Sequence, residues 1–222
     1  MKKTYLVINF KTYIKGSGKN AEKLAIIADN IAKQTKKNII LVVQNIDINR
    51  ISKLVSIPVY AQHMDPIEPG AHEGKILAES LKYDGAKGVV INHSEDKVKK
   101  DIIKKTRTIA KNHKLKTIIC AKNSKEAKEL AKFNPEFLAI EPPKLIGGNV
   151  SVSTAKPELI TETVNKVRSF NKKQKILCGA GVKTAKDVKK AIELGTQGVF
   201  VASGVVKAKN PKKEILELVK FL

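Results

Sequence analysis

The sequence predicts a closed (β/α)8 barrel, in which eight parallel strands each lead into a helix that packs outside the sheet. Two observations point to this fold. Eight short runs rich in Val, Ile and Leu recur along the 222 residues, and a helical hydrophobic pattern follows each run. A doubly wound open sheet is the alternative, but the regular count of eight favours closure. Because no linker or shift in composition interrupts the chain, we expect residues 1–222 to form a single domain.

Most of the predicted strands are near-continuous apolar stretches. Strands of a parallel sheet are covered by helices, so they lack the alternation of a half-exposed strand. In order, the predicted strands are Thr4–Asn9, Ile39–Val43, Val59–Gln62, Gly88–Asn92, Thr117–Ala121, Phe137–Glu141, Lys175–Cys178 and Gly198–Ala202.

The segments between these strands have helical periodicity. In Ala21–Lys33, the apolar residues Leu24, Ile27, Ala28 and Ile31 recur at the spacing of one helix face. The other predicted helices are a shorter one within Ile46–Leu54, then Ile76–Leu81, Val98–Ala110, Ala127–Phe133, Leu159–Val167, Val188–Leu194 and Ile215–Val219.

Capping signals agree with two of the helix boundaries. Thr184 is suited to cap the helix that follows it, and Gly195 stands just after that helix, where glycine is favoured. Asn210-Pro211 begins the last helix, with proline in its first turn.

The composition excludes several classes of protein. With 42% hydrophobic and 29% charged residues, the chain is neither disordered nor collagen-like. No apolar run approaches the roughly 20 residues of a membrane span, so we expect no association with a membrane. Cys120 and Cys178 alone form neither a disulfide framework nor a four-ligand zinc site. We therefore expect a cytoplasmic protein without a metal.

The formal net charge is +22, and lysine supplies nearly all of the basic residues. Arginine occurs only at Arg50, Arg107 and Arg168, and aromatic residues make up 5% of the chain. A basic nucleic-acid-binding protein is an alternative, but such proteins usually add arginine forks and aromatic platforms in a localised patch. We interpret the lysines as a solvated coat that steers small anions toward a cleft, and we expect no specific nucleic-acid partner.

Polar side chains gather where the predicted strands end. The functional sites of such barrels lie at the carboxyl ends of the strands. One strand ends in Asn9-Phe10-Lys11, another in Asn92-His93-Ser94-Glu95, and a third in Glu141. Small-residue turns follow the last two strands, at Cys178–Gly181 and Ala202–Gly204, where phosphate is often held by backbone N–H groups.

Each of these residues also has a structural explanation when it is considered alone. Lys11 is one of many lysines, His93 could be a hydrogen-bonded core histidine, and the glycines could simply make a tight turn. Glu141 is harder to explain, because a carboxylate after a buried strand is costly unless it is paired or functional. Together, a cation, a donor and a base suit proton abstraction beside a carbonyl.

At these residues the sequence resembles the triosephosphate isomerase family, in its shorter archaeal form. Any one motif is weak, but together they run in order almost from end to end. The motifs are Asn9-Phe10-Lys11, Ala61-Gln62-His63-Met64-Asp65-Pro66, Ile91-Asn92-His93-Ser94-Glu95, Ile140-Glu141-Pro142-Pro143, Ile146-Gly147, Cys178-Gly179-Ala180-Gly181 and Gly198–Gly204.

The resemblance implies isomerisation of dihydroxyacetone phosphate and D-glyceraldehyde 3-phosphate through an enediolate, in glycolysis and gluconeogenesis, without a cofactor. It implies that Glu141 is the base, that His93 is the electrophile, and that Lys11 is the cation near the substrate, with Asn9 beside it. The residues that it implies for the phosphate side are Ile146, Gly181, Ala202 and Ser203. Another phosphate-binding (β/α)8 isomerase would share the glycine turns, but it would not require these three catalytic residues together.

Three further expectations follow from the resemblance. Ser94-Glu95-Asp96 would open a helix whose dipole disfavours positive charge on His93. Pro142-Pro143 and Gly147-Gly148 would bound a lid that excludes water from the enediolate, so truncation of Leu145–Gly148 would raise phosphate elimination. The chain is expected to form a homo-oligomer, at least a dimer and, like archaeal-type members, a tetramer.

Overall fold

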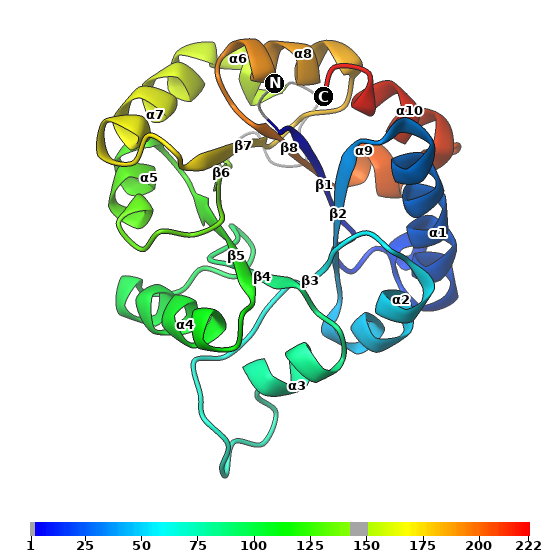
Figure 1. The fold of residues 1–222 in the computed structure, drawn as a ribbon. Coiled ribbons are helices and arrows are strands. Elements are labelled where there is room, and N and C mark those ends of the chain that lie inside the picture. The colour runs from blue at the N-terminus through cyan, green and yellow to red at the C-terminus, as the bar shows by residue number, and fades with distance from the viewer. Residues whose placement is uncertain (1–2, 143–150) are drawn as a thin grey trace.

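The computed structural model describes residues 3–142 and 151–222, and in it eight parallel strands close into a barrel surrounded by helices (Figure 1). Each strand pairs with the next along the chain, and the last pairs with the first. The predicted fold is therefore confirmed. The strands are β1 (Tyr5–Asn9), β2 (Asn38–Val43), β3 (Val59–Ala61), β4 (Gly88–Ile91), β5 (Lys116–Ala121), β6 (Phe137–Ile140), β7 (Lys175–Gly179) and β8 (Gly198–Val201).

A helix covers the outside of the barrel after each strand (Figure 1). All eight predicted helices are present, with boundaries shifted by a few residues. Two short helices near the mouth, α6 and α9, and two 3-10 turns, η1 (Ile14–Gly16) and η2 (Asn45–Asp47), were not predicted. The α-helices are α1 (Gly18–Thr35), α2 (Ile48–Leu54), α3 (Ala78–Tyr83), α4 (Lys100–Asn112), α5 (Ser124–Ala131), α6 (Val152–Ala155), α7 (Pro157–Phe170), α8 (Ala185–Glu193), α9 (Ser203–Val206) and α10 (Pro211–Val219).

The predicted caps are present. Thr184 and Asp187 form a reciprocal capping box at the start of α8, and Gly195 follows this helix with φ +95°, a conformation that favours glycine. The Asn210 side chain accepts a hydrogen bond from the N–H of Lys213 at the start of α10, where Pro211 is the first residue.

The hydrophobic core has two parts. The larger part lies between the sheet and the helices, and the smaller fills the inside of the barrel. In the inner part, Tyr60 and Phe137 lie near the start of their strands, whereas Cys120 and Phe200 lie nearer the carboxyl ends. Side chains thus make the middle of the barrel a packed core rather than a pore.

A buried carboxylate joins helix α1 to the loop before β3. One oxygen of Asp29 accepts hydrogen bonds from the N–H and hydroxyl of Ser56 and from the N–H of Ile57, and the other pairs with Lys33 at 2.7 Å. Burial alone would raise the pKa of the Asp29 carboxyl, but these bonds more than offset it and hold the pKa below its ordinary value.

We expect Asp29→Asn to lower the free energy of unfolding by about 1–3 kcal/mol at neutral pH, since charge-assisted bonds to a buried carboxylate are lost. A lowered pKa stabilises the fold above the ordinary carboxyl pKa, and this contribution disappears as pH falls through the folded-state value. Denaturant unfolding of both proteins should therefore show a difference that shrinks in acid. Asp101→Asn, at an exposed position of α4, is the control and should stay within about 0.5 kcal/mol. A difference that is constant with pH would contradict this account.

No helix in the described part of the chain is long and apolar enough to cross a bilayer.

Candidate active site

The carboxyl ends of the strands form a mouth at one end of the barrel. Two cavities, of about 190 and 40 Å³, adjoin at Lys11, which lines both. The larger is also lined by Asn9 and His93, and the smaller by Glu141. The structure thus brings together every predicted site residue that it describes. In the smaller cavity these include Gly181, Ala202 and Ser203.

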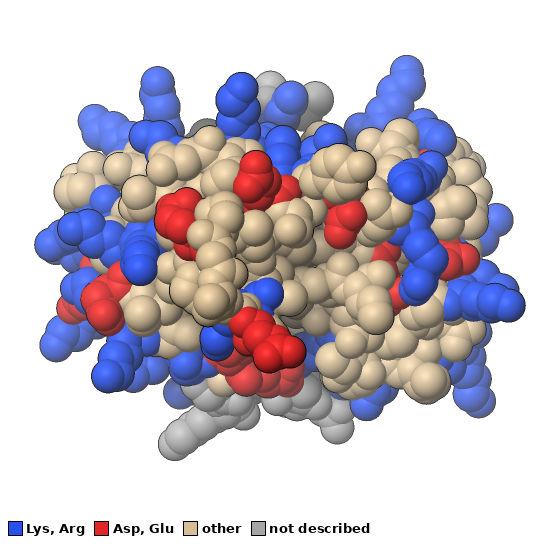
Figure 2. Space-filling model, turned by 90° about the horizontal axis from the view of Figure 1, so that it is seen from below, with Lys and Arg blue, Asp and Glu red and all other residues tan. Residues whose placement is uncertain are grey.

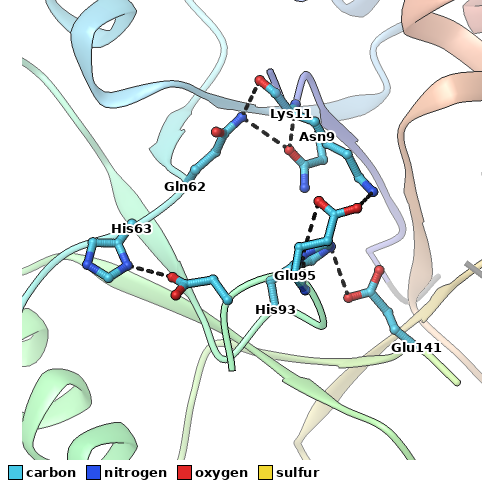
Figure 3. Close-up of polar contacts among 8 residues, drawn as sticks. Asn9, Lys11, Gln62, His63, His93, Glu95 and Glu141 are labelled. Atoms are coloured by element: carbon cyan, nitrogen blue, oxygen red, sulfur yellow. Dashed lines mark hydrogen bonds and ion pairs between the residues drawn. The ribbon is translucent and has the colours of Figure 1, made fainter. Parts of the chain in front are cut away.

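Lys11 is held in place through both its backbone and its side chain. Its backbone has φ +48°, and its N–H donates to Asn9 Oδ1 at 2.9 Å. Gln62 Nε2 donates to the Lys11 carbonyl oxygen at 2.9 Å. The ammonium group, whose side chain is 12% exposed, pairs with Glu95 Oε1 at 2.6 Å (Figure 3). The result is a cation fixed at the junction of the two cavities.

The hydrogen bonds of His93 define its tautomer. The backbone N–H of Glu95 lies 3.2 Å from His93 Nδ1 and can only donate, so Nδ1 is an acceptor without a proton. In the neutral ring the proton is then on Nε2, which lies 3.6 Å from Glu141 Oε2 (Figure 3). The ring also meets Phe200 edge-on, with centroids 6.3 Å apart. His93 therefore presents an N–H donor to the mouth.

The prediction that a helix opens at Ser94 was wrong. Helix α4 begins at Lys100, and a turn separates it from His93. Asn92, with φ +63°, starts this turn, and its side-chain oxygen accepts from the N–H of Val98 at 3.3 Å. The turn therefore presents a single N–H group to the ring, that of Glu95, in place of the expected helix end.

Glu141 is a buried carboxylate, 6% exposed, directly after β6. Its backbone N–H donates to the carbonyl oxygen of Ala121 at 2.9 Å, which continues the sheet by one bond. Its Oε2 is buried and has no hydrogen-bond partner among the residues that the structure describes. A carboxylate oxygen with a free lone pair at the mouth is suited to accept a proton from a bound molecule.

The sequence analysis named Cys120 only to exclude a disulfide framework and a zinc site, and the contact of Cys120 with Glu141 was missed. Burial raises the pKa of the Cys120 thiol well above its ordinary value, and the charge of Glu141 and a hydrogen bond to it raise this pKa further. The thiol is therefore protonated and donates to the carboxylate. Alternation along a strand could have indicated this contact, because Cys120 faces into the barrel with Ile118.

Three other contacts could not be read from the sequence. Both Gln62 and Glu95 lie within motifs of the resemblance, but their bonds to Lys11 join residues from different strand ends. His63 pairs with Asp96, Nδ1 to Oδ2 at 2.6 Å, and lies at the rim away from Lys11 (Figure 3).

Gly179, the last residue of β7, leaves room for Glu141. A Cβ at this position would lie 2.5 Å from Glu141 Cγ. The glycine is thus required by the close approach of the carboxylate side chain, in addition to any role in the turn that follows.

We expect Gly179→Ala to lower kcat by about 10²-fold, since displacement of a reacting group by about 1 Å costs this much. Turnover and far-ultraviolet circular dichroism would be measured together, to separate a displaced Glu141 carboxylate from an unfolded chain. Gly204→Ala is the control, because its added Cβ meets nothing closer than 3.4 Å. Equal kcat for both variants would show that the approach of Gly179 to Glu141 does not matter.

The residues that the resemblance implies for the phosphate side lie around the smaller cavity, apart from Ile146. Ala180 and Gly181 have φ of +70° and +74°, and Ser203 is the first residue of α9. The N–H groups of Gly181 and Ser203 have no hydrogen-bond partner in the described residues. Free N–H groups of this kind form anion sites. Ile146 and the segment Leu145–Gly148 lie outside the described residues.

No group of three or more His, Cys, Asp or Glu residues in residues 3–142 and 151–222 is arranged to hold a metal ion.

Comparison with known proteins gives concordant matches. Residues 4–222 match the family model described as triosephosphate isomerase. Relatives named triosephosphate isomerase include that of Methanocaldococcus jannaschii, 45% identical over 98% of this chain and 99% of the relative. That of Methanothermus fervidus is 44% identical over 99% of both chains, and that of Archaeoglobus fulgidus is 42% identical over 98% of this chain and 97% of the relative.

Proposed function

The chain belongs to the triosephosphate isomerase family, and from this membership and the geometry of the mouth we propose how it interconverts dihydroxyacetone phosphate and D-glyceraldehyde 3-phosphate. The enzyme is an isomerase that moves hydrogen between two neighbouring carbons. The observation that carries the proposal is the free Oε2 of buried Glu141, 3.6 Å from His93 Nε2. No cofactor is needed, because the hydrogen removed from one carbon is returned to the next.

Glu141 acts as the base. Its free carboxylate oxygen removes a proton from C1 of dihydroxyacetone phosphate, and the electrons of that C–H bond form an enediolate. The hydroxyl proton on the C1 oxygen passes to the oxygen on C2. The protonated acid then returns its proton to C2, so that C1 becomes the aldehyde carbon. The Cys120 thiol beneath it, through its hydrogen bond, fixes the orientation of the carboxylate.

His93 and Lys11 stabilise the charge that develops on oxygen. The Nε2–H of His93 donates to the substrate carbonyl and then to the enediolate oxygens, and a neutral donor matches the basicity of such an oxygen. The Lys11 ammonium adds a positive charge at the junction of the cavities, and Glu95 and Asn9 hold it there before substrate arrives. Such preorganised charge costs no rearrangement during the reaction.

The phosphate group would bind in the smaller cavity. The free N–H groups of Gly181 and Ser203 support this assignment, and Ala202 lies beside them. Lys11 borders the same cavity and supplies a cation. Ile146, expected on the phosphate side from the resemblance, completes the proposed set of substrate-binding residues.

We also propose that residues 1–222 are one catalytic domain, and that it acts in the cytoplasm, in glycolysis and gluconeogenesis.

The chain is proposed to assemble as a dimer or tetramer. The loop over residues 66–75 extends from the barrel between β3 and α3 (Figure 1), and Ile14 and Ile46 are 80% and 79% exposed. Figure 2 shows the face on the side of this loop: its centre has few Lys or Arg, which crowd its margins. Exposed apolar side chains favour contact between copies, and so, separately, does a face on which like charges are sparse. Light scattering should give a mass of two or four chains, and the 24.4 kDa of one chain would contradict this proposal.

The activity is tested by adding dihydroxyacetone phosphate to the purified protein and coupling the aldehyde formed to a reporter enzyme. Fast turnover in both directions is the expected result. Absence of turnover by a folded oligomer would mean that another phosphorylated substrate uses this mouth, as in other phosphate-binding barrels.

A further inference from the structure

The largest of the cavities described here lies at the end of the barrel opposite the mouth. It measures about 500 Å³ and is lined by the residues that begin the strands, such as Tyr5, Asn38 and Lys116. Its size is typical of a site for a small molecule. No part of the proposed isomerisation uses it, so the inference below does not depend on the proposed function.

Four lysines from three separate segments of the chain, each at or just before the start of a strand, line this cavity. Lys37 is engaged, because it donates to the carbonyl oxygen of Leu222. Lys87, Lys114 and Lys116 are exposed and have no acidic partner among the residues that the structure describes. The carboxylate in the lining, that of Glu136, is already paired with Lys175.

The unpaired ammonium groups come from adjacent chain segments. The backbone N–H of Lys116 donates to the carbonyl oxygen of Lys87 at 3.0 Å, so these two lysines start neighbouring strands. Lys114, two residues before Lys116, has φ +58°, a conformation in which glycine would be less strained. Like charges placed together repel one another, and a bound anion with several charges would remove this repulsion.

The remaining walls are largely apolar. Ile57 and the half-buried Tyr5 line the cavity with Pro58, above the buried ring of Phe137. Tyr5 is fixed edge-on against Phe137, with ring centroids 5.0 Å apart. A flat apolar group could therefore rest against these walls while its charged part meets the lysines.

We propose that this cavity binds a nucleoside polyphosphate. The phosphates contact Lys87, Lys114 and Lys116, and the base lies against Tyr5 and Pro58. The combination of clustered cations with an apolar wall selects this class over a free phosphate ion, which would use only the lysines.

Calorimetric titration with ATP, at about 0.15 M salt to screen non-specific attraction, tests the proposal. Saturating glycerol 3-phosphate would occupy the mouth. The informative variant is Lys114→Gly, matched by Lys36→Gly. Both lysines have positive φ, +58° and +55°, and follow helices, and both substitutions remove one charge and relieve backbone strain, but Lys36 does not line the cavity.

One saturable ATP site per chain is expected. Lys114→Gly should weaken it roughly tenfold, because a hydrogen bond to a charged group is lost, whereas Lys36→Gly should change it less than about twofold. Lys87→Gln provides a second variant, at an exposed position where the substitution should not disturb the fold. Isomerase turnover should be unchanged in all three variants. Equal weakening by Lys36→Gly and Lys114→Gly, or the absence of a saturable site, would overturn the proposal. Tripolyphosphate should bind more weakly than ATP, and equal affinity would overturn the contact with the base.

Discussion

Glu141→Gln is expected to slow isomerisation by about 10³–10⁴-fold with little change in KM, because the amide cannot accept the proton of C1. The substitution keeps the shape of the side chain, so it can still accept the hydrogen bond from Cys120 and fit beside Gly179. Steady-state turnover in both directions, together with exchange of the C1 proton into deuterated solvent, would measure the loss.

A matched control is Asp96→Asn, which changes a carboxylate at the rim of the same mouth. Asp96 pairs with His63 and is exposed, so we expect its loss to change kcat by less than about threefold. If Glu141→Gln retained solvent exchange at the native rate, another group would have to be the base.

His93→Ala is expected to lower kcat by about 10²–10³-fold, the usual effect of removing one positioned donor to a developing oxyanion. The Nε2–H faces the mouth because Nδ1 is occupied by the N–H of Glu95. Since the variant leaves a space of the size of the ring, added imidazole should restore part of the activity. Measurement of kcat at increasing imidazole concentration would show this rescue.

His63→Ala is the control for the loss of a histidine at the mouth. His63 pairs with Asp96 at the rim and makes no contact with Glu141 among the interactions described, so its removal should change kcat by less than about threefold. A raised KM with unchanged kcat in His93→Ala would indicate a role in binding alone and would contradict the proposed stabilisation of the enediolate.

The barrel could be predicted from the sequence because strands buried on both faces give continuous apolar runs, as in Ile39–Val43. The candidate site could be located because chemistry in this fold lies at strand ends, which selected Lys11, His93 and Glu141 before any comparison. Helices α6 and α9 escaped prediction because four residues are too few for a helical period.

The turn after His93 could not be predicted, because its shape depends on a tertiary arrangement. Asn92 bonds both to the carbonyl oxygen of Cys120, on the neighbouring strand, and to the N–H of Val98. Local propensity contains no information about the first of these bonds. For the same reason the partner of Lys11 was missed: Glu95 approaches it only because the barrel closes.

The close approach of Gly179 to Glu141 also restricts how this protein can change by mutation. Any side chain at position 179 collides with the acid, and a shorter acid at position 141 would draw the carboxylate back by roughly one C–C bond, about 1.5 Å. Neither position can therefore drift independently of the other. A lineage that acquired a larger residue at position 179 would have a poorly active enzyme until a second substitution compensated. The pair therefore restricts which substitutions this enzyme can accept one at a time.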